Sequence, residues 1–127
     1  MRLDERVVLA AAAIGLLPIA LSYGVAPQQS VPVLLGIPVE QVNLAHVFRA
    51  IMGLYLANAL FWMLAVFRPQ LRAAALWVLM LFMGGLALGR VLSLVTDGMP
   101  SLILLFYLGA ELVFASAALL LLMRKGD

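Results

Sequence analysis

Three ionisable residues, Arg49, Arg90 and Glu111, lie inside long apolar runs of the sequence. An ionisable side chain is costly inside a membrane, so such residues are functional candidates wherever the apolar runs span a bilayer. The planar arginine head can serve two carboxylates, or a carboxylate and an anionic ligand. Two cations against one carboxylate also leave a spare positive charge. These residue types therefore predict an ion-pair cluster that can bind an anion.

The three charges are predicted to share one layer of the protein. A helix rises about 1.5 Å per residue, which places Arg49 roughly 9 Å, Arg90 roughly 8 Å and Glu111 roughly 13 Å from the same membrane face. Other polar residues accompany them at the three- or four-residue spacing of one helix face. The predicted cluster consists of Asn43, His46, Arg49, Arg90, Ser93, Asp97, Tyr107 and Glu111.

Catalytic and metal chemistry find less support in the sequence. The chain has one histidine and no cysteine, which excludes a multi-histidine or thiolate metal site within a single chain. We assign no metal ligands, no cofactor and no catalytic residue, and expect a protein that is not an enzyme. If it is one, Glu111 and His46 are the candidate acid and base, acting on a lipid or isoprenoid.

The elements that must position these residues are four apolar segments. The chain of 127 residues is 66% hydrophobic and 11% charged, whereas soluble domains are roughly half apolar and a quarter charged. A membrane-spanning helix needs about 20 apolar residues. The sequence therefore predicts an all-α integral membrane four-helix bundle, forming a single domain over residues 1–127. The predicted helices cover residues 7–24, 43–67, 73–95 and 102–123.

The predicted outer loop, residues 25–41, is apolar and rich in proline. Its prolines and Gly36 disfavour a long regular helix. One interpretation is a lid or re-entrant segment that closes the outer mouth of the bundle. We favour the other, a connector resting at the lipid–water boundary.

The distribution of cations predicts the orientation of the bundle. With four spans, six of the eight cations fall on one side and none in the loops of the other side. Cytoplasmic loops carry an excess of Lys and Arg, so both termini are expected in the cytoplasm. Because the cations do not gather on one face, we expect membrane lipid as a partner and no nucleic acid. The six are Arg2, Arg6, Arg68, Arg72, Arg124 and Lys125.

Two further features of the spans concern packing. Gly85 and Gly89 form a GxxxG motif, which permits close contact between helices. Packing within the bundle and dimerisation explain this motif equally well. Asn58 lies in the middle of its span, on the side opposite Arg49, and is predicted to bond a neighbouring helix.

Two motifs carry a resemblance to a known family. The segment HVFRAIMGLY at residues 46–55 resembles the second-helix motif of small bacterial membrane proteins classified as domain-of-unknown-function family 4345. The segment LGRVLSLVTDGMPS at residues 88–101 is similar to the third-helix motif, and residues 107–111 are similar to the last helix. The resemblance implies four helices in a bacterial inner membrane but supplies no activity. The residues it marks as motif positions are Arg49, Arg90, Asp97 and Glu111.

Three functions stay open at this point. The leading hypothesis is a non-enzymatic membrane protein that binds a lipid-like or amphiphilic anion in its outer half, or serves as an accessory subunit of a membrane complex. The second is the membrane enzyme described above. The third is a structural or assembly protein whose ion pairs fix the register of its helices. Other membrane subunits, or further copies of the chain, are possible partners.

Overall fold

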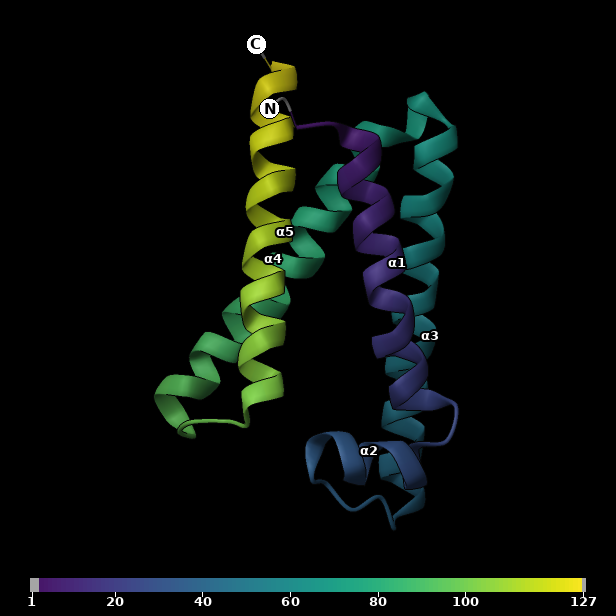
Figure 1. Ribbon diagram of the computed structural model, residues 1–127, viewed down its shortest axis with the longest axis vertical. Helices are drawn as coiled ribbons and strands as arrows, with labels where there is room; N and C mark the ends of the chain where they lie inside the picture. Colours follow the sequence, from purple (N-terminus) through teal and green to yellow (C-terminus); the bar gives the residue numbers. More distant parts are fainter. Residues whose placement is uncertain (1–2, 127) are drawn as a thin grey trace.

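The computed structural model describes residues 3–126, and all of its secondary structure in that range is helical (Figure 1). Four of the helices, α1, α3, α4 and α5, are long and apolar enough to cross a membrane. They lie at the four predicted segments, with bounds that differ by at most three residues. The elements are α1 (Glu5–Gly24), α2 (Pro27–Leu35), α3 (Val42–Phe67), the 3₁₀ turn η1 (Pro69–Leu71), α4 (Arg72–Thr96) and α5 (Leu102–Gly126).

The short helix α2 lies inside the predicted loop and was not expected. Pro27 occupies the first helical turn, where the N–H that proline lacks has no partner anyway. Gly36 then ends the helix in the left-handed conformation, with φ of 71°. The hydroxyl of Ser30 bonds the backbone carbonyls of Ala26 and Ser22, and this ties α2 to the end of α1. The prolines therefore do not prevent a helix in this segment, and Gly36 is the residue that ends it.

The long helices form two pairs. Helix α1 packs mainly along α3, and α4 mainly along α5. At one end the pairs meet in an apolar core that includes Leu9, Trp62, Leu76 and Leu121, all almost completely buried. Toward the other end the pairs diverge, and every residue of α4 beyond Ala87 is at least partly exposed. The bundle is thus closed at one end and open at the end where α2 lies.

Helices α1 and α3 approach closely at Gly24. A Cβ atom at this position would overlap the Cβ of Met52 on α3 and would lie 2.7 Å from its sulfur. Only glycine leaves room for α3 at this point. The end of α1 is therefore held directly against α3.

Basic residues secure the closed end, where Figure 1 places both termini and η1. Lys125 lies 3.0 Å from the carboxylate of Glu5, which links the end of α5 to the start of α1. Arg72 donates to the carbonyls of Ala65 and Val66 at 3.1 and 2.7 Å, and satisfies acceptors that the end of α3 leaves free. Asp4 accepts a hydrogen bond from the backbone N–H of Arg6 as the N-cap of α1, and this bond holds the pKa of its carboxyl group below its usual value.

Candidate functional site

An ion pair between α4 and α5 lies in the open half of the molecule. Nε of Arg90 is 2.9 Å from each carboxylate oxygen of Glu111. The Glu111 side chain is 7% exposed and that of Arg90 is 23% exposed. The Arg90 guanidinium also lies 5.8 Å from the ring centroid of Tyr107, in cation–π range. The structure therefore brings together three of the predicted cluster residues.

The turn between the two helices sets this pairing. Helices α4 and α5 are antiparallel neighbours, and the connection between them is short. Gly98 adopts a φ of 107°, a conformation that side chains disfavour, and so allows the tight reversal. Tyr107 and Glu111 are one helical turn apart and are both buried. They therefore face α4 at the level of Arg90.

The pairing leaves most donors of Arg90 available. Arginine has five N–H donors, and the bond to Glu111 uses only the one on Nε. Within residues 3–126 no hydrogen bond from the two terminal nitrogens to another protein atom meets ordinary geometry. These nitrogens can therefore bind an acceptor from outside the chain.

Arg90 and Glu111 line an apolar crevice of about 210 Å³. Four helices line it: α1 on one side, α4 and α5 on the other, and α3 through Tyr55. Small residues, Gly15 of α1 and Ala110 of α5, leave space along its length. Its polar groups are Arg90, Glu111 and the tyrosine side chains. The lining residues are Ala12, Gly15, Leu16, Ile19, Tyr55, Met83, Leu86, Arg90, Phe106, Tyr107, Ala110, Glu111 and Phe114.

A second, more open groove of about 520 Å³ lies between α3 and α4. It is lined by Leu54, Tyr55, Phe82, Gly85, Leu86, Gly89, Arg90 and Ser93. The GxxxG motif faces this groove, and a Cβ added at either of its glycines would meet nothing within 4 Å. The interpretation of this motif as a packing contact within the bundle is therefore wrong.

Arg49 does not join the ion pair, so the predicted cluster of both arginines with Glu111 does not form. Nη1 of Arg49 donates instead to the carbonyl of Gly24 at 2.9 Å and, more weakly, to that of Val25 at 3.5 Å. The reason is helix pairing, since α3 packs against α1 and its Arg49 meets the free carbonyls where α1 ends. Arg49 thus caps α1, and the spare positive charge is absent from the crevice.

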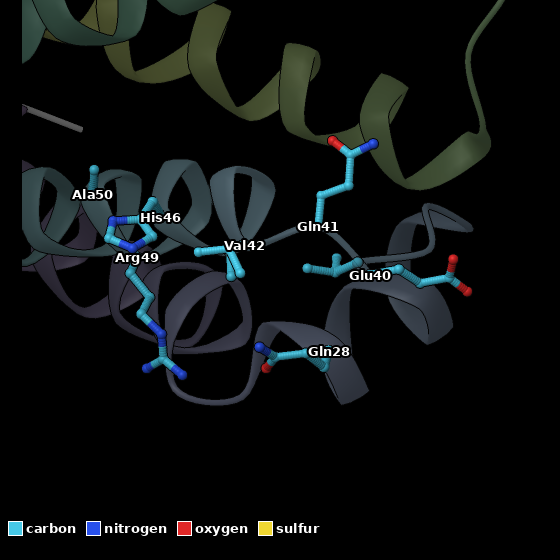
Figure 2. Close-up of a pocket in the computed structure, with 9 residues that line it drawn as sticks. Gln28, Glu40, Gln41, Val42, His46, Arg49 and Ala50 are labelled. Atoms are coloured by element: carbon cyan, nitrogen blue, oxygen red, sulfur yellow. The ribbon is translucent and has the colours of Figure 1, made fainter.

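Arg49 lines a different pocket, of about 570 Å³, at the α2 end of the molecule. Figure 2 shows its guanidinium on the same side as the Gln28 amide, whereas the Glu40 carboxylate points away from it. His46 lines the same pocket and is exposed. Because Glu111 lines the crevice and not this pocket, the structure does not bring together the proposed acid and base.

The remaining predicted cluster residues lie near the surface. Asn43 is exposed in the first turn of α3. The hydroxyl of Ser93 donates to Asp97 at 2.6 Å, and both residues are exposed at the end of α4. Asp97 therefore bonds to a residue one turn back on α4, and the carboxylate that pairs with Arg90 is that of Glu111. Of the eight predicted residues, three thus lie at the crevice, two in the α2-end pocket and two at this exposed end, while Asn43 lines neither the crevice nor the pocket.

Sequence reasoning did not select Tyr55, which lines the crevice, or Tyr23, whose ring packs against that of Tyr55. Tyr23 and Tyr55 are buried with ring centroids 5.9 Å apart, and Tyr55 also contacts Phe82 edge-on at 5.2 Å. The sequence did offer one indication, because Tyr55 carries a polar hydroxyl and lies inside the HVFRAIMGLY motif. Asn58 departs from its prediction, because its amide donates to the carbonyl of Leu54 in the same helix at 2.8 Å.

The helices and the site define a small all-helical protein with four helices of a length and composition that can cross a membrane, and with a buried ion pair between α4 and α5. Within residues 3–126, no group of three or more His, Cys, Asp or Glu residues could hold a metal ion. The chain matches the family described as Domain of unknown function (DUF4345) over residues 5–122, and it belongs to that family. The resemblance predicted from the motifs is confirmed. No curated protein and no solved structure matches the chain.

Proposed function

We propose that this chain is a membrane protein that binds a lipid-like amphiphile in the crevice between α1 and α5. The hydrocarbon part lies along the apolar wall, and the polar end accepts hydrogen bonds from Arg90. One observation carries the proposal: Arg90 presents unused donors at an apolar crevice while its Nε is fixed on Glu111. Ligand sites generally combine an apolar lining with a few polar groups that fix orientation.

The charge balance of the site defines what the polar end must offer. Arg90 is already neutralised by Glu111, and Arg49 is engaged at the end of α1. A negative charge on the ligand is therefore not required. The ligand does need hydrogen-bond acceptors, such as oxygen atoms, because only an acceptor can use the terminal N–H groups of Arg90. Ester, hydroxyl and phosphate oxygens all meet this requirement.

The membrane setting is part of the proposal. We place the four long helices across the bacterial inner membrane, with both termini in the cytoplasm. Supporting this, the basic residues Arg72, Arg124 and Lys125 make their contacts at the end that holds both termini. The open half of the molecule then lies in the outer leaflet, where lipid can enter the crevice sideways.

The competing function is structural, with the ion pair serving only to fix helix register. Native mass spectrometry of the protein extracted with its lipids separates the two. The test variant combines Arg90→Met with Glu111→Leu, which removes the pair without leaving a buried charge. Its matched control combines Lys125→Met with Glu5→Leu, which removes the ion pair at the closed end.

We expect the crevice variant to retain at least about tenfold less bound amphiphile, because a hydrogen bond to a charged group contributes about 1.5–3 kcal/mol and 1.4 kcal/mol is tenfold in affinity. The control variant should retain as much as the wild type. Equal retention in all three proteins, with the crevice variant folded, would overturn the proposal and leave the structural function.

A further inference from the structure

The crevice and the groove meet at a shared wall. Tyr55, Leu86 and Arg90 line both of them. One side of this wall faces α1 and α5, and the other faces the space between α3 and α4. A molecule whose polar end contacts Arg90 therefore has two apolar paths leading away from it, on opposite sides of the same three side chains.

The sizes of the two spaces indicate that one path alone is small. Drug-sized ligand sites generally measure about 300–1,000 Å³. The crevice, at about 210 Å³, falls below this range, while the groove, at about 520 Å³, lies within it. A ligand confined to the crevice would leave the groove side of Arg90 uncovered.

Glycines keep both paths open. Gly15 lines the crevice, and Gly85 and Gly89 line the groove. A Cβ added to any of the three would meet nothing within 4 Å. Neither path is thus filled by a neighbouring helix, and a larger side chain at these positions would project into free space.

We propose that the amphiphile is a two-chain lipid with acceptor oxygens at its branch point, one chain in the crevice and the other in the groove. This inference rests on the proposed function. Glycerolipids have the required chemistry, because ester oxygens lie where their two chains diverge. Arg90 lies at the junction of the paths and carries donors that such oxygens accept. The chain thereby recognises the branch of the lipid.

The experiment compares two lipids that differ only in chain number. Delipidated wild-type protein in detergent is titrated with diacyl phosphatidylglycerol and with its single-chain lyso form of equal chain length, and binding is measured by native mass spectrometry. We expect the diacyl lipid to bind at least about tenfold more tightly, because the stabilisation from burying hydrocarbon grows with the apolar area buried.

Two glycine variants locate the second chain. Gly89→Leu fills the groove, so it should reduce the preference for the diacyl lipid and leave binding of the lyso lipid unchanged. Gly109→Leu is the matched control, since Gly109 is exposed on α5, has open space around it and borders neither path. It should behave as the wild type.

The outcomes separate this inference from the proposed function. If both lipids bind equally and Gly89→Leu changes neither, the two-chain inference is wrong while an Arg90-dependent site stands. If neither lipid binds, the proposed function fails with it. If the wild type is a dimer that Gly89→Leu dissociates, a second copy of the chain occupies the groove, and the two-chain inference is overturned.

Discussion

At the scale of single residues, Arg90 and Glu111 form a buried ion pair, whereas Arg49 lies at the surface. The sequence was sufficient to find Arg49, Arg90 and Glu111, because charges in apolar segments stand out. It was not sufficient to assign partners among them. A similar depth in the membrane does not fix which helices are neighbours, and Arg49 lies on a helix whose partner is α1. The pair that formed involves adjacent helices joined by a short turn.

The ion pair gives a prediction about stability. Arg90→Met alone leaves the carboxylate of Glu111 buried without its partner, and breaking a buried pair in this way costs roughly 3–5 kcal/mol. Adding Glu111→Leu removes the orphaned charge, and the double variant should recover most or all of the lost stability. The measurement is thermal unfolding of both variants in the same detergent. Equal losses in the single and double variants would show that the two charges are not energetically coupled.

At the scale of helices, the composition predicted that four long helices exist and how long they are, but not which helices pack against each other. Each long helix is apolar over most of its surface, so no single face marks which neighbour it packs against. Helix α2 was missed for a different reason. Its prolines suggested a loop, yet Pro27 lies in the first turn, where proline is tolerated. The division into an α1–α3 pair and an α4–α5 pair therefore became visible only in three dimensions.

The α1–α3 contact gives a prediction at this scale. Gly24→Ala places a Cβ against Met52, and overpacking of this kind costs roughly 1–3 kcal/mol. Gly109→Ala is the matched control, because its Cβ meets open space and alanine favours a helix by up to about 1 kcal/mol. We expect opposite shifts of the unfolding midpoint in detergent. If both variants shift it in the same direction, the close approach of α1 to α3 does not exist.

At the scale of the whole molecule, the asymmetry between a closed end and an open end determines what the protein can bind. The closed end is held by Lys125, Arg124 and Arg72, each linking different parts of the chain. The open end lacks such ties between the two helix pairs within residues 3–126, apart from the contacts of α2. Arg90 lies on the open side, so the orientation of the bundle decides which leaflet supplies a ligand.

That orientation can be measured with single cysteines, because the chain contains none. Gln70→Cys marks the exposed turn at the closed end, and Met99→Cys marks the exposed turn between α4 and α5. With a membrane-impermeant thiol reagent on intact spheroplasts, we expect labelling at position 99 only. Position 70 should react after permeabilisation, because the positive-inside rule places that turn in the cytoplasm. Labelling of both positions from outside would contradict a spanning bundle. Labelling of position 70 alone would turn the open half, and the lipid that Arg90 contacts, toward the cytoplasmic leaflet.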